Sequence, residues 1–229
     1  MAKRTKQQQL SFARHTGWGG ARPGAGRKPK GTRAGTPHRG VPRHYHGHPV
    51  HATIRALPEV GSLRDCPVYP ALEAAIAAAS KPEFRVVHFS VQFDHLHLIL
   101  EAHDRDALMR GMRGLTIRCA RAINHALERK GRVWGDRYHT RALKTPREVR
   151  NALVYVLQNW RKSVPGAQCL DPCASGYWFD GWKGPRPAWA FPPAGERPPV
   201  RAPRTWLLTT AWRRHGLIAF DERPLDSLD

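Results

Sequence analysis

Apolar and polar residues change their spacing several times along this chain, and each spacing indicates a different element. Between residues 49 and 56 they alternate one by one, which predicts a half-buried strand because successive side chains of a strand point to opposite faces. An apolar, β-branched stretch over 84–93 and the segment 95–102 predict two more strands. Residues 132–144 also have a strand-like pattern.

In three segments, apolar residues recur every three or four positions, which indicates a helix with one buried face. Residues 69–80 are rich in alanine, and residues 104–130 carry one long apolar stripe: Leu108, Met112, Leu115, Cys119, Ile123 and Leu127. A third helix is predicted over 146–162, because Thr145 can cap it, Pro146 suits its first turn and Glu148 completes a capping box. A short helix is expected over about 204–215.

The predicted elements follow one another in the order β-α-β-β-α-β-α, which is typical of an α+β fold. We expect a split βαβ sandwich, in which helices cover mainly one face of an antiparallel sheet. This unit spans residues 46–163 and is long enough for one substantial core. Residues 164–229 are rich in proline and tryptophan, and we expect this C-terminal extension to pack back onto the unit.

Residues 1–45 have no apolar periodicity and contain no acidic residue. Their basic side chains, Lys28 and Lys30 among them, are interspersed with glycine and proline. This composition predicts a flexible basic arm that neutralises phosphates without recognising bases. The alternative is a solubilising tail, and the sequence alone does not separate the two.

The net charge indicates a polyanionic partner. Lys and Arg number 38 against 18 Asp and Glu, which leaves +20. Solubility does not require such an excess, so nucleic acid or an acidic membrane surface is the expected partner. No apolar run reaches the roughly 20 residues of a membrane span, so we expect no membrane insertion. With no signal-peptide pattern and four scattered cysteines, we expect a cytoplasmic protein.

The most informative stretch is Asp94-His95-Leu96-His97-Leu98-Ile99-Leu100. In a strand, His95 and His97 share one face, while the leucines next to them point to the other. Two neighbouring imidazoles can chelate a divalent cation, and they can equally be ordinary surface residues.

The helix predicted over 146–162 carries a second candidate. Tyr155 and Asn159 fall on the face opposite its apolar stripe, which is made by Val149, Leu153, Val156 and Trp160. Asn159 lies one turn beyond Tyr155 and could lend an oxygen to a cation or to a water bound to a phosphate. A lone helical tyrosine is otherwise a packing residue at the edge of a core.

Basic side chains also lie opposite the apolar stripe of the helix 104–130, where they could contact a DNA backbone. The candidates for DNA binding are Arg110, Arg113 and Arg121 on this helix, Arg137 beyond it, and Lys28 and Lys30 in the basic arm.

Together these motifs resemble those of a known superfamily. His95-Leu96-His97 resembles the His–hydrophobe–His motif of the HUH nucleases. Tyr155-Val156-Leu157-Gln158-Asn159 is similar to the Tyr-x-x-x-(Asn/Gln) helix of the single-tyrosine HUH transposases, especially the REP-associated tyrosine transposases. In these relatives the tyrosine helix also follows a segment like residues 133–139. The resemblance covers about residues 45–162, with the motifs in the family's order and spacing.

Two positions depart from the family pattern. Asp94 stands where the family usually has Asn before the first motif histidine, and Trp160 stands where many relatives have Pro. Neither change removes a chemical group that the motifs supply.

The resemblance implies a ferredoxin-like fold, a divalent cation (Mg²⁺ or Mn²⁺) bound by His95 and His97, and Tyr155 as the nucleophile with Asn159 assisting the metal. A phenol has a pKa near 10, so it needs a nearby positive charge to attack a phosphodiester at neutral pH. The implied function is a DNA transposase of the nucleoid, which cuts and rejoins single-stranded or hairpin DNA through a covalent phosphotyrosine. A homodimer that exchanges the tyrosine helix is a further candidate.

Other interpretations remain open at this point. Histidine-triad nucleotide hydrolases have a third histidine where this chain has Ile99, and a charge of +20 suits a polymer better than a mononucleotide. A domesticated DNA-binding protein would keep the basic surfaces without catalysis. Relaxases and replication initiators share the histidine motif, but their frequent second tyrosine is replaced here by Asn159. Tyr138 is the alternative nucleophile within the chain.

Overall fold

The structure is a computed structural model and describes residues 46–164, 167 and 169–224. It contains a four-stranded antiparallel sheet in the order β2-β3-β1-β4. The strands are β1 (Val50–Arg55), β2 (Phe84–Val91), β3 (His95–Ala102) and β4 (His139–Ala142). The helices are α1 (Val68–Ala77), α2 (Arg105–Ala126), α3 (Pro146–Gln158) and the short α4 (Trp206–Thr209). The predicted α+β class with an antiparallel sheet is confirmed.

Short 3-10 turns connect these elements: η1 (Pro58–Val60), η2 (Asn159–Lys162), η3 (Ser175–Trp178), η4 (Ala188–Ala190) and η5 (Ala211–His215). The predicted basic arm, including Lys28 and Lys30, lies outside the described residues. The proposed division into an arm, a catalytic unit and an extension therefore stays a prediction. In the described part of the chain, no helix is long and apolar enough to span a membrane.

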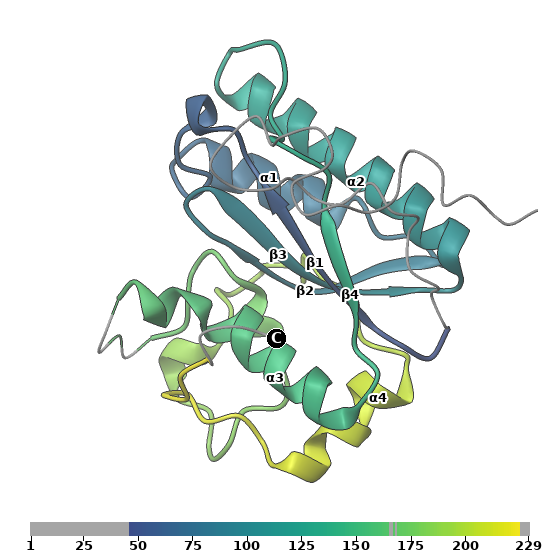
Figure 1. The fold of residues 1–229 in the computed structure, drawn as a ribbon. Helices are drawn as coiled ribbons and strands as arrows, with labels where there is room; N and C mark the ends of the chain where they lie inside the picture. Colours follow the sequence, from purple (N-terminus) through teal and green to yellow (C-terminus); the bar gives the residue numbers. More distant parts are fainter. Residues whose placement is uncertain (1–45, 165–166, 168, 225–229) are drawn as a thin grey trace, which may run out of the picture. The chain divides into compact units, whose positions relative to one another are not determined.

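One face of the sheet is covered by α1 and α2 (Figure 1). Ala52 and Ile54 of β1 and Leu96 and Leu98 of β3 point to this face and pack against the apolar stripe of α2. The N-terminus of α2 is capped by the carboxylate of Asp104, which accepts a hydrogen bond from the backbone N–H of Ala107 at 2.7 Å. The alternation and the helical stripe seen in the sequence thus form one shared core.

The opposite face of the sheet is covered by α3 (Figure 1). We expected the helices mainly on one face, and the tyrosine helix is the exception. The strand β2 has a bulge between Val86 and His88. There Val87 points away from α1 and α2, as Ile99 of β3 also does, and both side chains pack with α3. These two apolar side chains explain the position of the helix. The capping box predicted at the start of α3 is present, with Thr145 and Glu148 hydrogen-bonded to each other's backbone N–H groups.

The C-terminal extension packs against the other side of α3, in the same apolar cluster. Its buried members are Leu170, Phe179, Trp182, Ala190, Leu207, Leu208, Ala211, Trp212 and Ile218. Gly181 permits the close approach, since a Cβ there would lie 2.3 Å from the ring of Trp212. The buried carboxylate of Glu101 accepts hydrogen bonds from the backbone N–H groups of Arg204 and Thr205 and so holds the start of α4.

Three element boundaries differ from the sequence predictions. Within 132–144 only β4 is a strand, because Arg132 donates hydrogen bonds to the carbonyls of Trp134 and Gly135 and holds a loop there. The third helix ends at Gln158 and continues as η2. The segment 204–215 is broken at Thr210 into α4 and η5, where φ reaches −127°.

Candidate active site

His95 and His97 lie side by side on the face of the sheet that α3 covers. Their Nε2 atoms are 3.0 Å apart, and the ring planes are nearly perpendicular, at 86°. His97 is buried and His95 is half-buried. The two nitrogens therefore converge on one point at the edge of the core.

The other ring nitrogens of both histidines have partners. His95 Nδ1 lies 2.6 Å from a carboxylate oxygen of Asp94, and Asp94 also pairs with Arg55. His97 Nδ1 lies 3.1 Å from the hydroxyl oxygen of Thr53 on β1. Such contacts orient a metal-binding imidazole through the nitrogen that faces away from the metal. Both histidines are therefore held with Nε2 toward each other.

Asp94 stands where the related family usually has Asn, and its carboxylate has a defined place here. Although burial acts in the opposite direction, the hydrogen bond and the charge of His95, together with Arg55, hold the pKa of Asp94 below its usual value. The group is thus an anion next to His95 at neutral pH. The contact with His95 was not predicted from the sequence, where Asp94 is only a departure from the motif.

A third histidine, His51 of β1, completes the cluster. Its Nε2 lies 3.3 Å from His97 Nδ1, and the two rings stack with centroids 5.3 Å apart. The sequence placed His51 on the polar face of β1, but only the pairing of β1 with β3 shows that this face carries His97. His51 is a neighbour of the Nε2 pair and is not directed at it.

Burial keeps His97 and His51 neutral. Desolvation, followed by the proximity of His51, His95 and Lys162, holds the pKa of His97 well below its usual value. Desolvation also lowers the pKa of His51 to about 4, with smaller contributions from His139 and Arg141. A neutral imidazole keeps a lone pair for a metal ion, so these residues are in the form that binds cations.

Tyr155 reaches the cluster from α3. Its ring lies edge-on to His97, with centroids 5.1 Å apart, and 5.9 Å from His51. The sequence predicted a tyrosine away from the apolar stripe, and the side chain is indeed only half-buried. The helix is nevertheless covered on most sides, because the C-terminal extension packs against it. Tyr155 therefore lies at the edge of this apolar cluster.

Lys162 adds a positive charge beside the tyrosine. Its Nζ lies 4.7 Å from the centroid of the Tyr155 ring, and its charge is among the causes of the lowered pKa of His97. The neighbouring Arg161 fixes this turn, since it donates hydrogen bonds to the side chain of Gln158 and to the carbonyls of Ala167 and Cys169. Lys162 was not among the residues predicted from the sequence.

Asn159 lies at the end of α3, one turn beyond Tyr155, and is 7% exposed. It is the first residue of η2, so the helix axis ends at this side chain. Its role as a further cation ligand stays a prediction.

The chemistry of the histidine pair fits a divalent cation. In the described part of the chain, no group of three or more His, Cys, Asp or Glu side chains is arranged to hold a metal ion. Around an octahedral cation with bonds of about 2.1 Å, two adjacent ligand atoms lie about 3 Å apart. The distance of 3.0 Å between the two Nε2 atoms matches this spacing. Such an ion would take its remaining ligands from an amide, water or a substrate phosphate.

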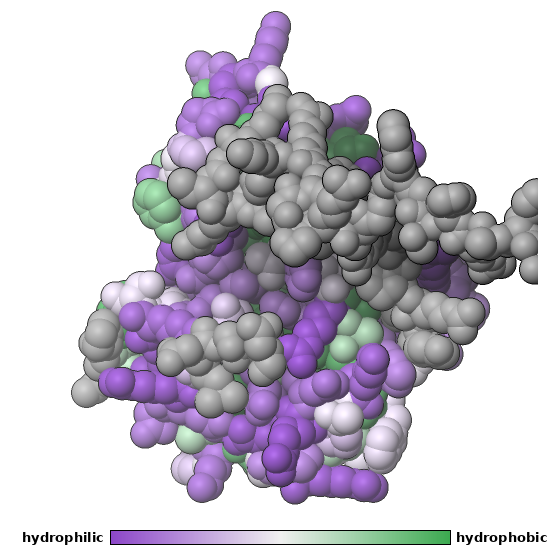
Figure 2. Space-filling view, viewed as in Figure 1, coloured by the Kyte–Doolittle hydropathy of each residue, from purple (hydrophilic) through white to green (hydrophobic). Residues whose placement is uncertain are grey.

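The arginines of α2 that were predicted to bind DNA do not lie at this site. Arg110, Arg113 and Arg121 lie exposed on α2, across the sheet from Tyr155, and Arg137 is exposed in the loop before β4. Hydrophilic residues cover most of the described surface visible in Figure 2. A strand at the histidines would therefore meet a different part of the molecule from a strand on α2.

Part of the chain is similar to a known family. Residues 66–159 match the family model described as "Transposase IS200 like". The matched segment includes β2, β3, α2 and α3, and hence both motif histidines, Tyr155 and Asn159. The match covers less than half of the chain.

A solved structure described as "Structure of the REP associates tyrosine transposase bound to a REP hairpin" is similar to this chain. The similarity covers 59% of this chain and 82% of that chain, with a TM-score of 0.43 and 17% sequence identity. No curated protein matches.

Proposed function

We propose that this chain is a DNA transposase that cuts and rejoins single-stranded DNA through a covalent bond between Tyr155 and a backbone phosphate. A divalent cation, Mg²⁺ or Mn²⁺, would be held by His95 and His97. The observation that carries the proposal is the contact of the Tyr155 ring with His97, whose Nε2 faces that of His95 at 3.0 Å. The family match supports the transposase role.

The proposed reaction exchanges one phosphodiester for another. The hydroxyl oxygen of Tyr155 attacks the phosphorus and loses its proton, while one P–O bond of the strand breaks and the departing oxygen takes up a proton. The phosphotyrosine ester retains the free energy of the broken bond. The strand can therefore be rejoined at another position without ATP, which transposition requires and simple hydrolysis does not.

The residues of the site have separate roles in this scheme. When bound, the cation supplies positive charge at the phosphate. Asp94 and Thr53 position the two histidines through their Nδ1 atoms. Lys162 lies over the ring of Tyr155, where its positive charge would stabilise negative charge that develops near the ring during the attack.

We further propose that Mn²⁺ supports the reaction at lower concentration than Mg²⁺. Two of the ligands would be imidazole nitrogens, whereas Mg²⁺ strongly prefers oxygen. Single-stranded or hairpin DNA is the proposed substrate, and the +20 charge of the chain is consistent with either.

The test is a search for the covalent intermediate. The protein is incubated with labelled single-stranded oligonucleotides from the flanks of its gene, with Mn²⁺, and separated under denaturing conditions. We expect a protein–DNA adduct, which tryptic mapping should place on the peptide 151–161 that contains Tyr155. Cleavage without an adduct would make the protein a hydrolytic nuclease. DNA binding without cleavage would make it a non-catalytic binding protein, and either result overturns the proposal.

A further inference from the structure

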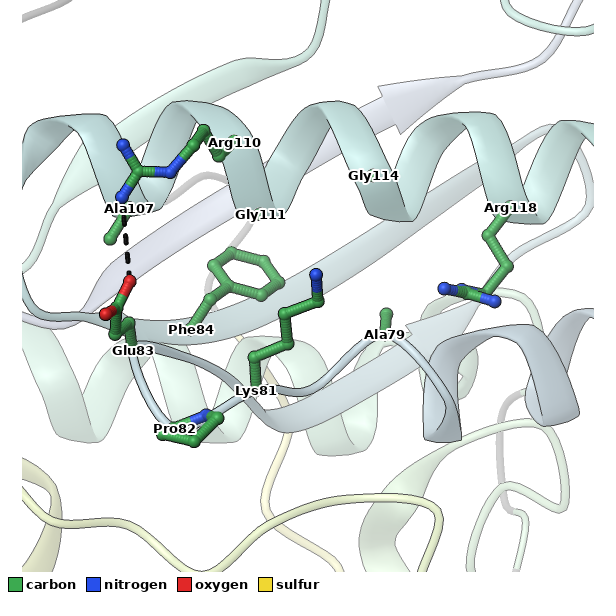
Figure 3. Close-up of a pocket in the computed structure, with 10 residues that line it drawn as sticks. All are labelled: Ala79, Lys81, Pro82, Glu83, Phe84, Ala107, Arg110, Gly111, Gly114 and Arg118. Atoms are coloured by element: carbon green, nitrogen blue, oxygen red, sulfur yellow. Dashed lines mark ion pairs between the residues drawn. The ribbon is translucent and has the colours of Figure 1, made fainter.

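A cavity of about 350 Å³ opens on the side of the sheet that α1 and α2 cover (Figure 3). It lies between α2 and the turn that joins α1 to β2. The lining residues on the turn are Ala79, Lys81, Pro82, Glu83 and Phe84, and those on α2 are Ala107, Arg110, Gly111, Gly114 and Arg118. The catalytic histidines and Tyr155 lie on the opposite face of the sheet, so this cavity is a separate feature.

Two glycines of α2 shape the cavity. A Cβ at Gly111 would lie 2.1 Å from the ring of Phe84, so glycine is needed there for that ring to pack beneath the helix. A Cβ at Gly114 would meet no atom within 4 Å, so this part of the helix surface is bare and open. A flat group could therefore lie directly against the backbone of α2 at Gly114.

Positive charge surrounds this bare surface. Arg110 and Arg118 stand on either side of Gly114 along α2, and Lys81 projects toward the helix from the turn (Figure 3). Lys81 is held in place by paired backbone hydrogen bonds with Phe84. The one acidic lining residue, Glu83, pairs with Arg110 at 3.5 Å, which leaves the charges of Lys81 and Arg118 for a ligand.

We propose that this cavity binds one unpaired nucleotide of the DNA, with its phosphate on Lys81 and Arg118 and its sugar and base against α2 at Gly114. The inference rests on the proposed function only in taking DNA as the partner. An apolar floor bordered by cations suits a nucleotide, which joins a flat base to an anion. A paired nucleotide cannot enter, because its base is stacked inside the duplex. The cavity would thus hold the strand at a point remote from the cut.

The test measures equilibrium binding of full-length protein to a labelled single strand and to a fully paired duplex. A Tyr155→Phe background prevents covalent trapping, so the result does not depend on cleavage. The double variant Lys81→Ala/Arg118→Ala removes two charges from the cavity. Its control is the double variant Arg113→Ala/Arg121→Ala, which removes two exposed charges of α2 that do not line the cavity. Gly114→Leu fills the cavity without changing charge, and Gly114→Ala is its control.

On the single strand, the Lys81/Arg118 double variant should lower affinity by about fivefold at about 0.1 M salt, since the one phosphate contact that is lost contributes about 0.7 to the log–log salt slope. Gly114→Leu should cause a comparable loss, whereas Gly114→Ala and the Arg113/Arg121 variant should each have a smaller effect. Binding of the duplex should be insensitive to Gly114→Leu.

The proposal is wrong if Gly114→Leu binds the single strand like the parent protein, or if both double variants lose affinity equally. A parent protein with no affinity for single strands would also overturn it, and the covalent-adduct experiment tests the proposed function separately.

Discussion

The edge of the Tyr155 ring faces the imidazole of His97 at a centroid distance of 5.1 Å and an interplanar angle of 81°. The contact joins α3 to β3 across the face of the sheet that α1 and α2 leave uncovered. It brings the histidine motif of β3 and the tyrosine of α3 into one place.

His95→Ala or His97→Ala should abolish formation of the covalent adduct and leave DNA affinity within a few-fold of the parent protein. The reason is that these side chains would bind the cation, whereas the strand is held mainly by basic residues elsewhere. Adduct formation and equilibrium binding are measured on the same oligonucleotide with Mn²⁺. An adduct of undiminished yield in the variant that lacks both histidines would rule out the metal assignment.

Tyr155→Phe should lose the adduct and fold normally, because it removes one hydroxyl from a half-buried ring. Tyr138→Phe is the matched control and should keep the adduct, since Tyr138 packs with the α1–α2 core on the other face of the sheet. Asn159→Ala should slow the reaction without eliminating it, because two histidines would still hold the cation. An adduct that maps to the peptide of Tyr138 would contradict the assignment of the nucleophile.

Asp94→Asn should raise the Mn²⁺ concentration needed for half-maximal cleavage by about tenfold to 100-fold, as is usual when the partner of a metal-binding histidine is changed. The amide keeps a hydrogen-bond acceptor 2.6 Å from His95 Nδ1 but loses the negative charge. The rate at saturating Mn²⁺ should be close to that of the parent protein. If the metal titration of the variant overlays that of the parent, Asp94 does not position His95.

Lys162→Gln should slow adduct formation by about tenfold, a modest effect for an exposed charge that solvent partly screens. The reason is that the ring loses the cation that lies 4.7 Å from its centroid. Lys162→Arg should restore much of the rate, and the exposed Lys130→Gln should have no effect. An unchanged rate in Lys162→Gln together with weaker DNA binding would assign this lysine to DNA binding alone.

The buried His88 should make the folded chain less stable at acidic pH. Burial lowers its pKa to about 4, whereas in the unfolded chain the value is near 6.5. Between these values the unfolded chain binds a proton that the folded chain does not, so this contribution is complete above about pH 6.5 and is lost as the pH falls toward 4. From pH 7.5 to pH 5 the loss is about 2 kcal/mol, at about 1.4 kcal/mol per pKa unit.

Urea denaturation at these two pH values measures the effect. His88→Asn can still bond to Ser175, 3.1 Å from His88 Nδ1, but it cannot titrate. Its free energy of unfolding should fall less between pH 7.5 and pH 5 than that of the parent protein. Burial also lowers the pKa of His51, so this residue should leave a residual pH dependence in the variant. Equal losses in both proteins would show that His88 does not contribute.

Much of the fold could be predicted from local patterns. The strand predicted at residues 95–102 is β3, and the capping box predicted at Thr145 and Glu148 begins α3. The candidate residues His95, His97 and Tyr155 were selected from their spacing and from the family resemblance, and the structure brings them together. These successes concern features that depend on residues close in the sequence.

The neighbours of these residues could not be predicted in the same way. His51 and Thr53 meet His97 because β1 pairs with β3 in one particular register, with Thr53 opposite His97. Lys162 meets Tyr155 because α3 ends at Gln158 and the chain turns back through η2. A shift of one residue in the register would have turned His51 away, and nothing in the local pattern of β1 excludes that shift.

By itself, the sequence determined which side chains share a face, since the periods of strands and helices are local properties of the backbone. Only the tertiary structure decided which faces meet. The bulge in β2 and the side chain of Ile99 created a second apolar face of the sheet, α3 was placed on it, and the C-terminal extension then covered α3. These contacts join residues distant in the chain, so they depend on packing and strand register, which no local pattern encodes.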